Sequence, residues 1–545
     1  MTQKLSDLIK KNRFTLPAAL ILWAVTFVTD TRIFSSDGLN MNCLPVDTKM
    51  IPFMHILTKI CVLLLLYGLI RFLIYAFMQK SILFVFLFFM AVYGTGLLVT
   101  WPGYYMNDDP IIFAYATRYL PVYWHNYLTS LFYMVSMSVF PASCGPVLLS
   151  DVCYALTFTY LFDRGGRKII LVLPGLLPFV LLGALMCFRP AVYSSFFLFY
   201  FLILFFDHRQ KTPLTPGRFI LLSFLTAVLC LWRSESIILL PLSVILIPLT
   251  YHHKNEAGKN EGWIDRLHKH PLRLAALFLF AAVAFFLILS MPQKHGENKY
   301  YGSDYLIIST TRPLSVIVWR DQTYEGADED IANISAVTEF GYLHNDSLSC
   351  SAYTRYNSDH NEGRYTQTGA DRETQKKYLK SAFRLILHNL DLYFGERLQL
   401  FLITNGYFNY DSSMVLDLDP IVSTDFHLYD HDKDYGMEML NAYLRLPLEH
   451  HDGYALFLYK YGGEAFIPVM LLCFAFMIVF LVRKKWLCFF IFASFMAREA
   501  VIFLTAPTSF IQYSYPSMFA VSALLLILLS EHLPSFRSSK QDQVA

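Results

Sequence analysis

The sequence predicts an all-α polytopic membrane protein with about twelve transmembrane helices and an α-rich or mixed segment outside the membrane. Three observations favour this class. Hydrophobic residues make up 55% of the chain and charged residues only 16%, against about 25% charged in a typical soluble domain. Mean hydropathy is +0.42. Long apolar runs recur along the chain, and Lys and Arg gather in alternate loops between them.

The apolar runs define the expected spans, because a helix needs about 20 mostly apolar residues to cross the hydrocarbon core. The first run lacks a small-residue cleavage site and is interpreted as an anchor, not as a signal peptide. The run 126–142 is shorter and amphipathic, which favours an interfacial or re-entrant helix. Spans are expected near 14–29, 51–70, 81–100, 144–162, 168–188, 191–206, 218–232, 236–251, 272–291, 460–482, 486–505 and 511–530.

Positive charge in the short loops predicts the orientation. One set of alternate loops, together with the two chain ends, holds roughly 22 Lys and Arg, and the opposite short loops hold roughly five. Both termini are therefore expected in the cytoplasm, in a multi-pass protein of the inner (plasma) membrane. The expected division is a transmembrane domain at 1–291 with an outer loop at 101–143, an extracytoplasmic domain at 292–459, and C-terminal transmembrane helices with a cytoplasmic tail at 460–545.

Several kinds of site are excluded or left without support by the sequence. A net charge of +2 gives no footprint for nucleic acid, and no Walker A or Rossmann glycine pattern occurs. The nine cysteines have no metal spacing, and only Cys43 and Cys350 fall in expected outer segments, where they could pair. The acidic run from Asp417 to Asp434 lacks the glycine and glutamate offsets of a calcium loop. No metal ligand or cofactor is assigned, and a divalent metal is left open.

Two adjacent carboxylates stand out in the expected outer loop. In "WPGYYMNDDP", Asp108 and Asp109 directly follow an apolar span. An acid before Pro110 is typical of a helix start, because its oxygens accept hydrogen bonds from free backbone donors. The same pair could supply a base or a metal ligand, since adjacent carboxylates raise each other's pKa unless a cation lies nearby.

Four further polar residues lie at the expected outer ends of spans. His125, in "YWHNY", is either an interfacial histidine or a polar contact to a substrate. Arg189 and Arg233 either extend their charge to the interface or bind phosphate oxygens, which guanidinium groups match with two hydrogen bonds. Glu235 follows Arg233 by two residues, and charges at a membrane edge are candidates for function.

These motifs, in this order, resemble the GT-C superfamily of membrane glycosyltransferases, which use polyprenyl-phosphate-linked sugars as donors. The resemblance, to a bacterial branch of the group, covers the layout of most of the chain and a few short motifs. Pro102 and Gly103 precede an acid, and His125 follows in "YWHNYLTSLF". The segments "FRPAVYSSFFLFYFLIL" and "LWRSESIILLPLS" are similar to Arg-bearing spans of the family. "YNSDHNEGRY" and "YLKSAFRLILHNLDLYF" are similar to its outer segment.

Near the C-terminus, "IQYSYPSMF" is similar to an element that opens the family's last span, although Gln512 stands where the family has Arg. The resemblance implies a transferase that moves a sugar to a glycan, lipid or protein acceptor on the outer face, with inversion. It implies catalytic roles for Asp108 and Asp109, with Asp108 as the base. It implies substrate-binding roles for His125, Arg189, Arg233, Glu235 and Tyr513. The lipid bilayer is an expected partner, and nucleic acid is not.

Two other classes stay open. A polymerase of lipid-linked polysaccharide repeats would use arginines of the outer segment, where Arg312, Arg320, Arg355 and Arg364 are available. A transporter would have broken spans and acids near mid-membrane.

Overall fold

Every regular element in the described part of the chain is a helix, and the only strand-like pairing there is an isolated parallel bridge between Tyr104 and Met186. The all-α class is therefore confirmed. The computed structural model describes residues 14–33, 46–101, 103–105, 109–251, 270–301, 304–338, 370–404, 466–506 and 513–530.

Among the described residues, seven helical stretches are long and apolar enough to cross a membrane, by length and composition. They are Thr48–Met78, Lys80–Val99, Gly145–Arg164, Arg189–Arg209, Ser234–Tyr251, Pro271–Tyr300 and Trp486–Thr505. Four other expected spans coincide with shorter apolar helices, in α2 (Thr15–Ile33), α10 (Pro216–Trp232), α22 (Phe466–Val482) and α24 (Tyr515–Ser530). The structure thus supports a membrane protein, with seven full-length spans among the described residues, and it does not confirm the twelve predicted.

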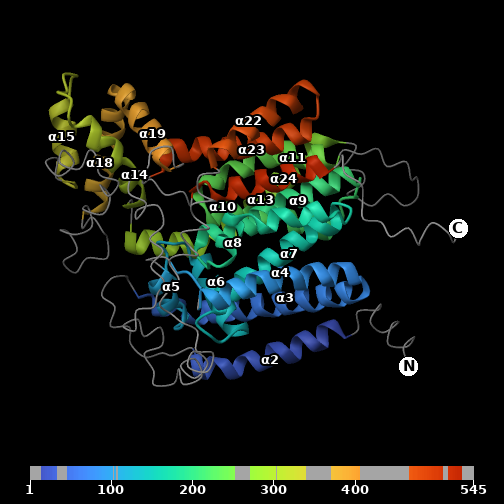
Figure 1. Ribbon diagram of the computed structural model, residues 1–545. Helices are drawn as coiled ribbons and strands as arrows, with labels where there is room; N and C mark the ends of the chain where they lie inside the picture. The colour runs from blue at the N-terminus through green and yellow to red at the C-terminus, as the bar shows by residue number, and fades with distance from the viewer. Residues whose placement is uncertain are drawn as a thin grey trace, which may run out of the picture.

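The helices of the bundle run side by side (Figure 1). Besides the four just named, they are α3 (Ile51–Met78), α4 (Lys80–Val99), α5 (Asp109–Ala116), α6 (Tyr127–Val139), α7 (Gly145–Arg164), α8 (Pro178–Ala184), α9 (Arg189–Arg209), α11 (Leu239–Tyr251), α13 (Pro271–Gly296) and α23 (Trp486–Thr505). Short 3₁₀ helices are η1 (Thr48–Met50), η2 (Ile169–Leu176) and η3 (Ser234–Ile238), and η4 (Glu297–Tyr301) is a π-helical turn.

The expected span at 168–188 is broken in the structure. It consists of η2 and α8, followed by non-helical backbone up to Arg189. Pro174 and Pro178 remove backbone donors, which disfavours a continuous α-helix. At Gly175 a Cβ atom would lie 2.4 Å from the Phe89 ring, so the close approach of α4 requires glycine. The break leaves irregular backbone beside the start of α9.

Helix α6 corresponds to the short amphipathic run at 126–142. It is buried along nearly its whole length and packs against α3, α5 and α7, so it lies inside the bundle and not on its surface. Two of its serine hydroxyls are satisfied within the helix. Ser136 and Ser138 donate to the carbonyls of Phe132 and Met134, at 2.5 and 2.9 Å.

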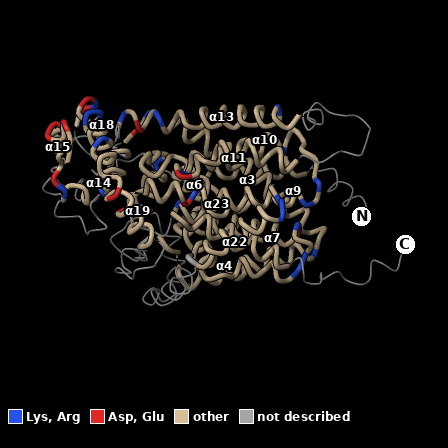
Figure 2. The backbone as a smooth tube through the Cα atoms, turned by 90° about the horizontal axis from the view of Figure 1, so that it is seen from above, with Lys and Arg blue, Asp and Glu red and all other residues tan. Residues whose placement is uncertain are grey.

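The two ends of the bundle differ in charge (Figure 2). Basic residues gather where α2 begins and α24 ends, and we call this the basic end; it includes Arg164, Arg167, Arg209, Arg218, Arg273, Arg483, Lys484 and Lys485. Four helices project beyond the opposite end (Figure 1). These helices, called the cap, are α14 (Asp304–Ile317), α15 (Ala327–Ser335), α18 (Arg372–His388) and α19 (Leu390–Thr404). The cap has its own apolar core, which includes Ile307, Leu314, Tyr378 and Leu385. The preceding helix α13 extends to Gly296, past the expected boundary at 291.

Candidate functional site

The segment that precedes the paired carboxylates is held against the broken span. Gly103 has a φ of +108°, and a Cβ atom there would lie 2.6 Å from Val147. Both facts require glycine. Tyr104 N donates to the Leu185 carbonyl at 3.0 Å, and the Tyr105 hydroxyl donates to the Ser143 carbonyl. The loop therefore returns into the bundle, next to the backbone that leads into α9.

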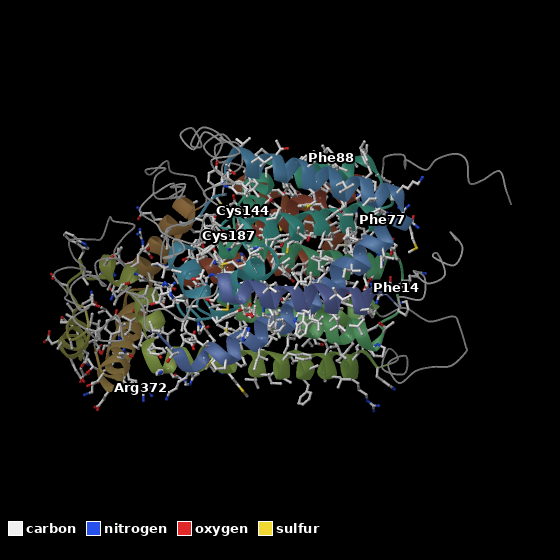
Figure 3. The ribbon with its side chains drawn as sticks, turned by 90° about the horizontal axis from the view of Figure 1, so that it is seen from below. Phe14, Phe77, Phe88, Cys144, Cys187 and Arg372 are labelled. Carbon is white, nitrogen blue, oxygen red and sulfur yellow. The ribbon has the colours of Figure 1, made fainter. Side chains whose placement is uncertain are left out.

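Asp109 is the first residue of α5 and is fully buried. Its carboxylate interacts electrostatically with Tyr133 and Cys187, whose hydroxyl and Sγ atoms lie 2.9 Å apart. Figure 3 shows Cys187 towards the cap end of the bundle, far from Phe14 and Phe77 at the basic end. Asp108, the expected base, lies outside the described residues, so its position relative to Asp109 is not described.

His125 and Arg189 lie together in the structure. Arg189 is the first residue of α9, and its Nη1 donates to the His125 carbonyl at 3.2 Å. The next residue, Asn126, caps α6 and donates to the Leu231 carbonyl at 2.9 Å, which ties this segment to the end of α10. Arg189 also interacts electrostatically with Glu235. The loop and the α10–α11 hairpin therefore converge on Arg189.

Arg233 and Glu235 form a buried ion pair at the tip of that hairpin. Arg233 is the C-cap of α10, and Glu235 lies in η3. Arg233 Nη2 and Nε lie 2.5 and 2.6 Å from Glu235 Oε1. Their side chains are 1% and 9% exposed, so the two charges are almost wholly withdrawn from solvent. Such a pair is stable only with good geometry and further hydrogen bonds.

A second charged pair, from α23, completes the group. Arg498 Nη2 lies 3.1 Å from Glu235 Oε1, and Arg498 Nη1 lies 3.3 Å from Glu499 Oε1. Arg498 Nε donates to Ser236 Oγ at 3.2 Å, and Ser514 Oγ donates to Glu499 Oε2 at 2.7 Å. We call Arg233, Glu235, Arg498 and Glu499 the Arg–Glu cluster.

Tyr513 lies against both guanidinium groups of the cluster. The Arg233 guanidinium carbon is 5.2 Å from the centre of the Tyr513 ring, a cation–π distance. The Tyr513 carbonyl accepts a 2.7 Å hydrogen bond from Arg498 Nη1. Tyr513, predicted from the sequence as a substrate-binding residue, therefore contacts Arg233 and Arg498. Gln512 lies outside the described residues.

Charge counting shows what this arrangement can bind. With Arg189 included, three guanidinium groups face two carboxylates, Glu235 and Glu499, which leaves one positive charge in excess. Arg233 Nη1 is buried and has no hydrogen-bond acceptor among the described residues. A buried donor without an acceptor is costly. An anion that offers oxygens at this point would remove that cost and the charge imbalance together.

Sequence reasoning missed Arg498 and Glu499. They lie in "FASFMAREAVIF", inside the expected span 486–505, and were not singled out as candidates. The signal was present, because ionisable residues within a span usually face the protein interior and mark functional positions.

The cap arginines that a polymerase would need are committed to carboxylates where they are described. Arg312 Nε lies 2.7 Å from Glu396 Oε1. The other oxygen of this carboxylate, Oε2, pairs with Arg397. Arg320 Nη2 lies 2.6 Å from Asp391 Oδ2, and these hydrogen bonds lower the pKa of Asp391 to about 2. Arg355 and Arg364 lie outside the described residues.

The described residues contain no group of three or more His, Cys, Asp or Glu side chains that could hold a metal ion. The acidic run 417–434 and the pair Cys43 and Cys350 lie outside this part of the chain. No family model, curated protein or solved structure matches the chain. Any functional conclusion therefore depends on the site itself.

Proposed function

We propose that this protein is an integral membrane glycosyltransferase that moves a sugar from a polyprenyl-phosphate donor to a glycan, lipid or protein acceptor at the cap face. The observation that carries the proposal is the buried Arg–Glu cluster at the cap end, with Arg189 beside it and one positive charge in excess. Buried guanidinium groups match phosphate oxygens in geometry and in charge.

The depth of the cluster fits a lipid headgroup. Arg498 lies seven residues before the end of α23, or about 10 Å along the helix axis. A phosphate at the membrane surface would therefore need to enter only a short distance between α10, α23 and α24. Fixed positive charge at this point would stabilise the polyprenyl phosphate as it leaves.

The contacts of Asp109 and Arg189 support a single donor site that includes the outer loop. Cys187 interacts with Asp109, and Arg189 interacts with Glu235. Cys187 and Arg189 are two residues apart, so at most about 7 Å of backbone separates them. We assign Asp108 as the base that accepts the proton of the acceptor hydroxyl, and Asp109 as the residue that anchors the start of α5. Attack opposite the phosphate gives inversion.

The proposal includes a topology. The chain crosses the inner (plasma) membrane about twelve times, with both termini at the basic end in the cytoplasm and the cap outside. Nucleotide sugars are not normally present outside the cell, so a donor carried by a lipid is the chemical solution for transfer at that face.

One observation favours a transporter as the second candidate. The span formed by η2 and α8 is broken, and substrate sites of transporters are commonly built from discontinuous helices. However, the Arg–Glu cluster lies near one end of the bundle, about 10 Å from the end of α23, whereas transporter sites lie near the midplane.

Lipid-linked sugars in a strain that lacks this protein provide the test. We expect one polyprenyl-phosphate sugar to accumulate, and its level to return to normal with the wild-type protein but not with Asp108→Asn. An unchanged pool of lipid-linked sugars in the deletion strain contradicts the proposal. If the pool is normal but uptake or export of a solute is lost, the transporter is favoured.

A further inference from the structure

A buried carboxyl outside the proposed site has no partner. Asp151 lies in α7, six residues from its start, which places it about 9 Å along the helix from the cap end. It is fully buried, and neither of its carboxylate oxygens has a hydrogen-bond partner among the described residues. By contrast, the buried carboxylate of Asp207 lies 2.9 Å from Arg218. A buried carboxyl that has neither a hydrogen-bond partner nor a positively charged partner requires a separate explanation.

The groups around Asp151 are uncharged at neutral pH. The titratable residues that interact with it are Tyr93 from α4 and Cys144, Cys153 and Tyr154 from its own helix. The neighbouring η2 and α8 contain no titratable residue. Among the described titratable groups of α6 and α9, none interacts with Asp151. No Arg, Lys or His in the described chain therefore compensates a negative charge here.

The carboxyl lies beside the broken span. The Tyr93 hydroxyl donates to the Gly175 carbonyl of η2 at 3.0 Å. The Tyr154 hydroxyl, one turn after Asp151, donates to the Ala191 carbonyl at 2.7 Å and closely approaches Gly183 of α8. Both hydroxyl protons are therefore directed away from the carboxyl. Cys144, the N-cap of α7, lies towards the cap end in Figure 3.

Because no positively charged side chain neutralises Asp151, the group that binds to it must supply the positive charge. An ionised carboxylate in this environment would be strongly disfavoured. Metal cations such as Ca²⁺ need six or more oxygen ligands, and no group of three His, Cys, Asp or Glu occurs in the described residues. A proton needs one oxygen only and neutralises the group completely.

We propose that Asp151 is an intramembrane proton-binding site, which holds a proton at neutral pH and releases it reversibly beside the broken span. The step is simple: the carboxylate takes up one proton to become a carboxylic acid, and it returns that proton when the group becomes hydrated. This inference goes beyond the proposed transferase activity and does not depend on it.

Infrared spectroscopy of the purified protein in lipid nanodiscs tests the proposal without any substrate. The spectrum of Asp151→Asn is subtracted from that of the wild type, so that only the carbonyl band of a protonated Asp151 remains. We expect this band at about pH 6 and its loss by about pH 9, the range in which buried carboxyls titrate. Asp151→Glu should titrate in the same way with a shifted band. Asp207→Asn, which removes a carboxyl paired with Arg218, should leave no such difference band.

Two results would overturn the assignment. If the band is absent at about pH 6, Asp151 is ionised and has a partner. If the band persists unchanged at about pH 9, the carboxyl is permanently neutral and structural. Normal detergent elution and thermal unfolding of Asp151→Asn show that the subtraction compares folded proteins, and Asp151→Glu provides the comparison if Asn does not fold.

Discussion

Arg233 has two anionic partners with different roles. The carboxylate of Glu235 is a structural partner, and the proposed phosphate is part of the substrate. If Arg233 serves only to neutralise Glu235, removing both charges should restore the protein completely. If it also binds phosphate, removing both charges should restore stability alone. The Arg–Glu cluster therefore permits a test that separates folding from binding.

We predict that Arg233→Met weakens binding of the polyprenyl-phosphate donor roughly 10- to 150-fold, because one charged hydrogen bond contributes about 1.5–3 kcal/mol. It should also lower the temperature of unfolding, since Glu235 loses a partner. In the double variant Arg233→Met/Glu235→Gln, unfolding should return towards the wild type while donor binding stays weak. Arg483→Met, an exposed change at the basic end, is the control. Recovery of donor binding in the double variant would contradict a phosphate role.

We predict that Asp108 and Asp109 have different roles, Asp108 in catalysis and Asp109 mainly in stability. Asp108→Asn cannot accept a proton, so turnover should fall about 100- to 10,000-fold with little change in unfolding. Asp109 is fully buried at the start of α5, so Asp109→Asn should lower the unfolding temperature and reduce turnover less. Sugar transfer and thermal unfolding of both purified variants, at matched concentration, decide the matter. A larger loss of turnover in Asp109→Asn would move the role of base to that residue.

At the residue scale, sequence reasoning identified some residues of the candidate site and missed others. Arg189, Arg233 and Glu235 attract notice because they lie at the ends of apolar runs. Arg498 and Glu499 do not, because the apolar run continues on both sides of them. Only the packing of α23 against η3 brings Arg498 to Glu235, and a contact across 263 positions leaves no local pattern.

At the element scale, the close pairing of the segment 103–105 with the broken span depends on Gly103. The loop follows a positive φ there, and its backbone passes directly over Val147. The hydrophobic pattern predicts an uninterrupted helix at 168–188, because apolar residues alone do not show that a helix is broken. Pro174, Gly175 and Pro178 give the physical reason for the break.

We predict that Gly103→Ala lowers transfer activity and the unfolding temperature, because the added Cβ atom meets Val147 and the positive φ is costly for alanine, about 1–2 kcal/mol. Gly103→Ala/Val147→Ala should relieve the clash but not the backbone strain, so recovery should be partial. Gly68→Ala is the matched control, since a Cβ atom there meets nothing within 4 Å. Full activity in Gly103→Ala would exclude a positioning role for this loop.

At the scale of the whole molecule, the loop charges agree with the arrangement of the described helices. The predicted cytoplasmic arginines and lysines that are described do gather at one end of the bundle, opposite the cap (Figure 2). The number of full-length spans was harder to predict, because helices such as α10 and α24 are shorter than a bilayer requires by themselves. Their hydrophobic composition marks them as buried but does not determine whether they cross.

The topology predicts opposite labelling of the two ends. Lys376 of the cap and Arg483 of the basic end are both exposed. In intact cells, a membrane-impermeant thiol reagent should label Lys376→Cys and not Arg483→Cys, and after lysis it should label both. The wild type measures the background from the native cysteines. Labelling of Arg483→Cys before lysis, with protection of Lys376→Cys, would invert the topology and place the site at the wrong face.

The most direct test of the central claim, that the Arg–Glu cluster binds a lipid phosphate, is a comparison of two lipids on the purified protein. Native mass spectrometry would measure binding of polyprenyl phosphate and of the uncharged polyprenol of equal length. The account predicts that the wild type binds the phosphate roughly 10- to 150-fold more tightly, the effect of one charged hydrogen bond. It predicts that Arg233→Met/Glu235→Gln removes most of this difference. Equal binding of the two lipids by the folded wild-type protein would contradict the account.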